Sequence, residues 1–119
     1  MLSGILSSAI SGLNLNSQRV SASADNISNA NTPDYKRVEI QAKTLTVDQT
    51  SGTSYSPGGV IATSRQLSDV GASIGAINNS TDVGTEFVNL IQAESAYAAN
   101  LKVVQAGEDM AKQLLDVKA

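Results

Sequence analysis

The sequence contains no cysteine and no histidine, and these two absences narrow the chemistry open to it. Without cysteine, the 119-residue chain has neither a disulfide nor a thiol nucleophile. Without histidine, it lacks the commonest general base near neutral pH and a frequent zinc ligand. No phosphate-binding glycine motif or calcium-loop spacing is present either. We therefore expect no catalytic site, metal or cofactor, and a protein that is not an enzyme.

Aromatic residues are also scarce, at 3% of the chain, and tryptophan is absent. Alanine and serine are abundant instead; they bury little area each but allow backbones to approach closely. This composition favours thin layers and helix-on-helix contacts over one thick core. The length fits one small domain.

The chain also has no strong excess of charge of one sign and no long apolar run. The net charge is −3 and the basic residues form no patch, so nucleic-acid binding has no electrostatic support. No run approaches the about 18 apolar residues that predict a membrane span, and the first residues lack the basic region of a signal peptide. We expect no stable membrane insertion, no cleaved signal peptide and no small-molecule substrate.

The N-terminal part carries a heptad pattern that predicts a helix over residues 3–30. A second series of smaller residues lies between the apolar positions, which is typical of a coiled coil. The two series are Leu6, Leu13, Val20 and Ile27, and Leu2, Ala9, Asn16 and Ser23. The other face holds serine, asparagine and only two charges, Arg19 and Asp25. Such a face indicates contact with other helices, and a weakly folded terminus is the alternative.

The C-terminal part predicts a longer helix over residues 82–117. Thr81 or Asp82 is placed to cap its start, and Glu86 lies in the first turn, where the helix dipole favours a carboxylate. Steps of three and four residues trace one seam, interrupted by two glutamates. The seam is Phe87, Leu90, Glu94, Tyr97, Leu101, Val104, Glu108, Ala111 and Leu115. Gly107 indicates a close neighbouring backbone or is a neutral accident.

Between the helices, alternating residues predict a small β-hairpin. Proline cannot continue a helix, so Asn31-Thr32-Pro33-Asp34 ends the first one. Residues 38–47 read as a strand whose change of parity predicts a bulge near Lys43 and Thr44. A return strand follows over residues 60–64, after a stretch rich in turn residues.

The remaining connection, residues 65–81, reads as an extended segment or a broken helix. The predicted fold class is therefore mainly α: two long terminal helices, in residues 1–35 and 82–119, paired as an antiparallel coiled coil. A small β-hairpin and the connection, residues 36–81, lie between them. Two paired helices leave apolar flanks uncovered, which other copies or homologous chains would cover.

Three segments resemble the terminal signatures of bacterial flagellar rod and hook proteins. At the N-terminal end these are Ser11-Gly12-Leu13-Asn14-Leu15-Asn16-Ser17-Gln18-Arg19-Val20 and Ala24-Asp25-Asn26-Ile27-Ser28-Asn29-Ala30-Asn31-Thr32-Pro33-Asp34-Tyr35-Lys36-Arg37. Residues 82–105 are similar to the C-terminal signature. The short insert is similar to that of proximal-rod proteins, whereas the end motifs are closer to the hook and distal-rod type.

The resemblance implies a core of paired terminal helices that packs concentrically into a hollow axial tube. It also implies export without a cleaved signal peptide through the flagellar type III apparatus, and a place in the periplasm-spanning rod of the basal body. Two departures stand out. Asp34 replaces the usual glycine, which aspartate tolerates at a positive φ, and Glu94-Ser95 replaces a pair that often contains arginine.

Several residues carry a functional and an ordinary interpretation side by side. Three asparagines near the end of the first helix bond to backbone between packed subunits, or simply terminate the helix; they are Asn26, Asn29 and Asn31. Tyr35-Lys36-Arg37 anchors the strand start on the helix pair or forms a solvated turn. Glu94 pairs with Arg19 or, as we favour, reaches out to the edge.

The expected function is structural. The residues assigned to assembly and helix packing are Leu6, Leu13, Val20, Ile27, Asn26, Asn29, Asn31, Pro33, Tyr35, Phe87, Leu90, Tyr97, Leu101, Val104 and Leu115. Their expected partners are the protein itself, homologous rod or hook proteins and the export apparatus. The alternative is a coiled-coil adaptor or accessory protein of the flagellar system that does not polymerise.

Overall fold

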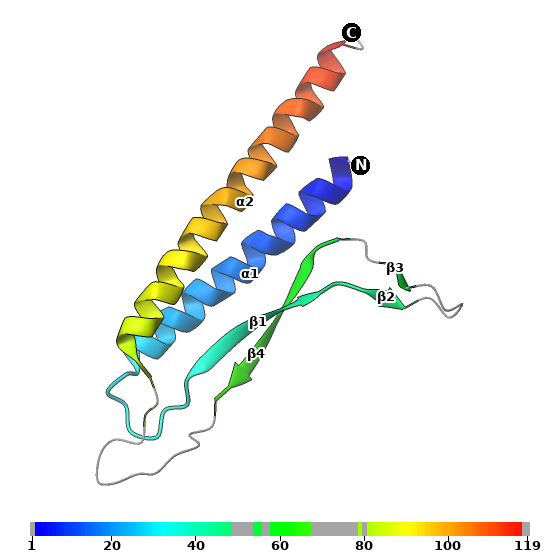
Figure 1. Cartoon of the computed structure of the whole chain (residues 1–119). Helices are drawn as coiled ribbons and strands as arrows, with labels where there is room; N and C mark the ends of the chain where they lie inside the picture. The colour runs from blue at the N-terminus through cyan, green and yellow to red at the C-terminus, as the bar shows by residue number, and fades with distance from the viewer. Residues whose placement is uncertain (1, 49–53, 56–57, 68–78, 80, 118–119) are drawn as a thin grey trace.

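The computed structural model describes residues 2–48, 54–55, 58–67, 79 and 81–117. Their elements, in chain order, are α1 (Leu2–Ser28), β1 (Val38–Thr44), β2 (Val47–Asp48), β3 (Ser54–Tyr55), β4 (Val60–Gln66) and α2 (Val83–Val117). Figure 1 shows α1 and α2 running side by side in opposite directions, with the strands on the other side of α1. The predicted fold class, two paired terminal helices with a small hairpin between them, is confirmed.

The helix ends follow the local signals closely. The carboxylate of Asp82 accepts hydrogen bonds from the Gly84 N–H at 3.0 Å and the Thr85 hydroxyl at 2.9 Å, so Asp82 caps α2 as predicted. At the same end of the helix pair, α1 stops at Ser28, two residues short of the predicted position. Asp34 then takes a φ of 58°, in the left-handed region where glycine was expected from the resemblance.

The elements lie in a single layer with α1 in the middle. α2 packs along one side of α1, β1 and β4 pack along another, and no described strand packs against α2. The molecule measures 71 × 37 × 14 Å, and its smallest dimension is close to the about 10–12 Å diameter of one helix. The buried apolar side chains of the described residues are few, namely Ala9, Leu15, Ala22 and Ala93. The chain thus has the thin layer, and not the thick core, that its composition favours.

The α1 side of the helix seam matches the heptad prediction. The smaller residues of the predicted second series, Ala9, Asn16 and Ser23, are buried. The larger residues of the first series are half-buried beside them: Leu6, Leu13, Val20 and Ile27. Leu15, which the pattern did not select, is also buried.

The α2 side of the seam was predicted wrongly by one residue at every second position. Leu90, Val104 and Ala111 are half-buried, as expected. The alternate seam positions are instead Glu86, Ala93 and Gly107, which are buried. Four large residues of the predicted seam are instead exposed: Phe87 at 51%, Tyr97 at 38%, Leu101 at 42% and Leu115 at 71%.

Close helix contact explains this rotation. A Cβ built on Gly12 would lie 2.5 Å from the Asn100 Nδ2 atom, and one built on Gly107 would lie 2.7 Å from a Leu6 methyl group. Only small residues fit at such a distance, so the bulky ridge turns outward by the about 100° between successive helix positions. The close neighbour of Gly107 is the Leu6 side chain, so the prediction of a neighbouring backbone is wrong.

The hairpin differs from the prediction at its bulge. β1 and β4 pair without interruption from Val38 opposite Gln66 to Thr44 opposite Val60, so the predicted bulge near Lys43 and Thr44 is wrong. The register changes further on, because β2 pairs Val47 with Tyr55 and two additional residues lie on the return side. Gly58 and Gly59, with φ of 80° and 105°, supply the backbone freedom needed there.

Two remaining predictions concern the connection between the strands and α2, and membrane insertion. Most of the predicted connection over residues 65–81 lies outside the described residues, apart from its first positions and residues 79 and 81. None of the described helices has the length and hydrophobicity needed to cross a membrane.

Candidate functional site

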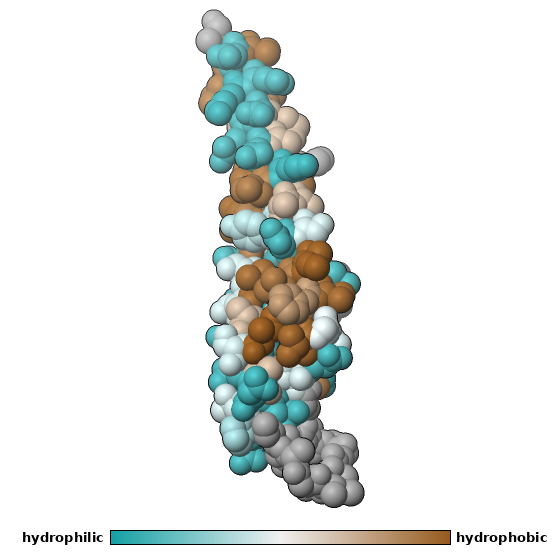
Figure 2. All heavy atoms as spheres, turned by 90° about the vertical axis from the view of Figure 1, so that its left-hand side faces the viewer, coloured by the Kyte–Doolittle hydropathy of each residue, from teal (hydrophilic) through white to brown (hydrophobic). Residues whose placement is uncertain are grey.

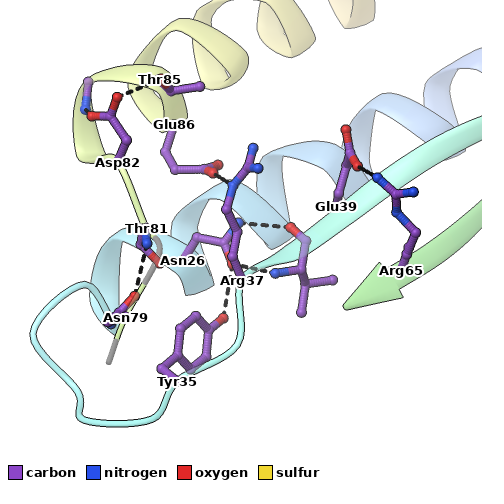
Figure 3. A network of polar contacts seen from close by, with 12 residues as sticks. Asn26, Tyr35, Arg37, Glu39, Arg65, Asn79, Thr81, Asp82, Thr85 and Glu86 are labelled. Atoms are coloured by element: carbon purple, nitrogen blue, oxygen red, sulfur yellow. Dashed lines mark hydrogen bonds and ion pairs between the residues drawn. The ribbon is translucent and has the colours of Figure 1, made fainter. Parts of the chain in front are cut away.

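The end of α1, the lead-in to β1 and the first turn of α2 meet in a polar junction, shown in Figure 3. We use this name for Asn26, Tyr35, Arg37 and Glu86. These four residues come from three separate segments, so the junction fixes how the hairpin and the two helices meet.

Asn26 is the centre of the junction and is fully buried, at 0% exposure. Its Nδ2 donates to the Val38 carbonyl at 2.8 Å, and its Oδ1 accepts from the Val38 N–H at 2.9 Å. The Tyr35 hydroxyl donates to the same Oδ1 at 3.0 Å. The side-chain amide therefore pairs with Val38 as a neighbouring strand would. The expectation that Asn26 bonds between subunits is wrong, because these partners are in its own chain and satisfy it.

Glu86 and Arg37 form a buried ion pair. The Arg37 Nε donates to Glu86 Oε1, and the Glu86 side chain is only 1% exposed. Burial by itself acts to raise the pKa of Glu86. Hydrogen bonds from Arg37, Asn26 and Ser23, with the Arg37 charge, outweigh it and bring that pKa below the ordinary value. Glu86 is thus held ionised. The sequence predicted only a favourable interaction with the helix dipole, whereas the structure adds the ion pair with Arg37.

The contacts of Tyr35 with Asn26 and of Arg37 with Glu86 confirm that residues 35–37 anchor the start of β1 on the helix pair. Lys36, between them, is exposed. Burial, followed by the nearby charges of Asp25 and Glu86, raises the pKa of the Tyr35 phenol. The Tyr35 hydroxyl consequently remains a hydrogen-bond donor at neutral pH.

The turn after α1 is held by a residue close to α2. The Asn79 Nδ2 lies 2.6 Å from the Asn29 carbonyl and 3.0 Å from each of the Ala30 and Thr32 carbonyls. One amide group therefore donates to three carbonyl oxygens. Asn29 donates to the Asp25 carbonyl at 2.9 Å, which is ordinary helix termination, and Asn31 is exposed. These bonds tie the two helix ends together near the junction.

The hairpin has a second attachment farther along α1. The Ser11 hydroxyl accepts from the Val60 N–H at 3.1 Å and donates to the Ser8 carbonyl at 2.7 Å. Gly58 and Gly59 lie directly over these serines, where a Cβ would come within 2.7 and 3.0 Å of their hydroxyl oxygens. Small residues on α1 thus let the hairpin backbone approach the helix.

An open groove of about 370 Å³ lies between α1, α2 and β1, beside the junction. Arg19, Arg37, Glu39 and Glu86 line it together with small, amide and β-branched apolar side chains. Glu94 is exposed, and the ion pairs of the described residues join Arg37 to Glu86, Arg65 to Glu39 and Lys112 to Asp109, so Arg19 and Glu94 do not pair. In the described ranges, acidic side chains nowhere gather in a group of three that could hold a metal.

The outer side of α2 carries an apolar surface, which we call the α2 ridge and which comprises Val83, Phe87, Val88, Ile91 and Leu101. These side chains are 37–63% exposed. Figure 2 shows apolar side chains gathered near the middle of the molecule on this side. The last turns of α2 add four more exposed apolar residues, Met110, Leu114, Leu115 and Val117.

Two family models match the chain, one at each end. Residues 6–36 match the model described as flagella basal body rod protein. Residues 75–117 match the model described as flagellar basal body rod FlgEFG protein C-terminal. The two matched segments cover most of α1 and all of α2, and they include three of the four residues of the polar junction, Asn26, Tyr35 and Glu86.

Curated relatives are similar over half or more of this chain. The flagellar hook proteins FlgE of Brucella abortus and Brucella melitensis are each 37% identical over 86 residues, or 71% of this chain and 21% of theirs. The flagellar hook protein FlgE of Rhizobium meliloti is 41% identical over 59 residues, or 50% of this chain and 14% of its own. The chain thus spans about a fifth or less of the length of these relatives.

Proposed function

Because the chain belongs to the family of bacterial flagellar rod and hook proteins, we propose that it is a structural subunit of the flagellar basal-body rod. One observation carries this proposal: the chain is a single layer whose apolar ridge is left open to solvent. A layer one helix thick cannot cover its own apolar flanks, so neighbouring subunits must do so.

The assembly contacts are assigned from the two helices. On α2 they comprise the α2 ridge together with Leu90, Tyr97 and Leu115, and on α1 they comprise the half-buried flank at Leu6, Leu13 and Val20. These two flanks border the same seam, so a neighbouring helix lying on one face would contact both. The remaining outer face of α1 is rich in serine and asparagine, and small uncharged side chains suit close helix contact.

The choice of rod over hook rests on the small size of the insert. Between the helices lie two short antiparallel pairs and a connection, over residues 36–81, which is little material for an outer domain. The matched relatives are hook proteins, and their names describe them alone. The proposed work of this chain is mechanical: it adds a layer to the rod, transmits torque and leaves a channel open.

The proposed partners and location follow from the same role. The chain packs against itself and against homologous rod or hook proteins in the periplasm-spanning part of the basal body. It reaches that place through the flagellar export apparatus, without a cleaved signal peptide.

The substitution Leu101→Asp tests this function directly. Leu101 is 42% exposed and lies on the α2 ridge, so an aspartate there should leave the chain folded and place a charge in the subunit contact. We expect cells carrying only this variant to lose rod assembly and swimming. Lys102→Asp, one position along on the same exposed helix, is the matched control and should swim. Normal swimming with Leu101→Asp would contradict the packing role of α2.

A further inference from the structure

Glu86 is the most deeply buried ionisable side chain among the described residues, and one cation neutralises it. Glu86 is 1% exposed, whereas Arg37, its partner, is 19% exposed. Burying an isolated carboxylate is very costly, and breaking a buried pair by removing one member is strongly destabilising. The position of Glu86 in the α1–α2 seam is therefore acceptable only while Arg37 is in place.

Other charged groups near Glu86 do not replace Arg37. Arg19 on α1 and Glu39 on β1 line the same groove, but Glu39 is bound to Arg65 and no ion pair joins Arg19 to Glu86. Asp25 on α1 and Asp82 at the start of α2 are carboxyl groups and supply no positive charge, and the Tyr35 phenol before β1 is uncharged at neutral pH. Among the described side chains, Arg37 is the cation that contacts it.

Arg37 is placed by the docking of the hairpin. The next residue, Val38, is bound through both backbone groups to the buried amide of Asn26, and Tyr35 bonds to the same amide. β1 and β4 pack on α1, and no described strand packs on α2. The ion pair is consequently the described link by which the hairpin side of the chain reaches α2.

We propose that the Arg37–Glu86 pair is a latch, which makes the pairing of α2 with α1 conditional on the docking of residues 35–38. If these residues leave α1, Glu86 loses its cation inside the seam, so the first turns of α2 separate as well. The hairpin base and the start of α2 therefore open and close as one unit. The latch is a property of a single chain and stands whether or not the chain polymerises.

Hydrogen–deuterium exchange on the full chain tests the latch, at a concentration where circular dichroism shows the wild type to be helical. Arg37→Met should lower the protection of residues 38–44 and of residues 86–97 together, by roughly 100-fold. The double variant R37M/E86M should restore residues 86–97 to within roughly threefold of wild type, because no unpaired charge remains in the seam. Arg65→Met breaks the exposed pair with Glu39 and should leave residues 86–97 unchanged.

The pH dependence of urea unfolding supplies a readout that a purely steric role would not move. Without Arg37, burial raises the pKa of Glu86 in the folded chain, so R37M should become more stable as the pH falls from 7 to 5. The stability of R37M/E86M should not rise over this pH range, because the double variant has no carboxyl group at position 86.

Three results would overturn the latch. One is an R37M variant that loosens residues 38–44 but leaves residues 86–97 protected. Another is a double variant R37M/E86M in which residues 86–97 are no better protected than in R37M. This comparison also decides the matter if R37M fails to fold, because the double variant should then fold. The last is a wild type in which residues 86–97 show no protection.

Discussion

Replacing Phe87 and Ile91 together by serine should prevent assembly at concentrations where the wild type assembles, and leave the helices paired. Both residues lie on the α2 ridge, at 51% and 63% exposure, so about half or more of each side chain is not used within the chain. Neither residue lies in the seam with α1, where Glu86, Ala93 and Gly107 are buried.

The magnitude follows from this unused surface. Burying a large apolar side chain completely contributes about 1.5–3 kcal/mol, and the exposed share of these two leaves about 1–2 kcal/mol each for a neighbouring subunit. Losing about 3 kcal/mol per contact corresponds to about a 100-fold rise in the concentration needed for assembly. Serine has about the same helix propensity as phenylalanine and isoleucine, so the loss comes from the apolar contact and not from the helix itself.

The assay is sedimentation velocity over a concentration series, with electron microscopy of any large particles. The double variant Lys102→Ser with Gln113→Ser is the control, because both positions are exposed on α2 and receive the same residue. Circular dichroism should give equal helix content for both variants. Assembly of the Phe87 and Ile91 variant at the wild-type concentration would refute the reasoning, because the ridge would then not be a subunit contact.

Two further predictions concern the polar junction. Asn26→Ala leaves the Val38 N–H and carbonyl without their buried partners, and should lower the free energy of unfolding by about 3 kcal/mol in a urea titration, whereas Tyr35→Phe removes one bond and should cost about 1 kcal/mol. Glu86→Gln should flatten the acid limb of the stability curve: the pKa of Glu86 is lower in the folded chain than in the unfolded one, so its contribution is present above the unfolded pKa and lost as the pH falls through the folded pKa. A wild-type stability that rises on acidification would contradict this assignment.

Local patterns in the sequence were sufficient for the secondary structure. The heptads predicted both helices to within two residues at each end, because an amphipathic repeat selects the helical period wherever it occurs. Asp82 as the cap and Asp34 at a positive φ followed from short-range preferences and from the family resemblance. The alternation at residues 38–44 indicated a strand for the same local reason.

The sequence also contained one misleading signal. The apolar seam through Phe87, Leu101 and Leu115 indicated where α2 is most hydrophobic, and this is not the side that meets α1. A heptad pattern marks an apolar stripe but does not say whether the same chain or another one covers it. Glycine at positions 12 and 107 allows the helices to approach so closely that small residues occupy the seam.

Only the tertiary structure decided the polar junction. Arg37 and Glu86 are 49 residues apart, and Asn26 and Val38 are 12 apart, so no local spacing relates either pair. The composition of the chain determined that it forms a thin helical layer without a site for catalysis by cysteine or histidine. Which side chains are buried as partners depended on how α1, α2 and the hairpin meet in space, because a buried polar group is stable only where a distant segment brings its complement.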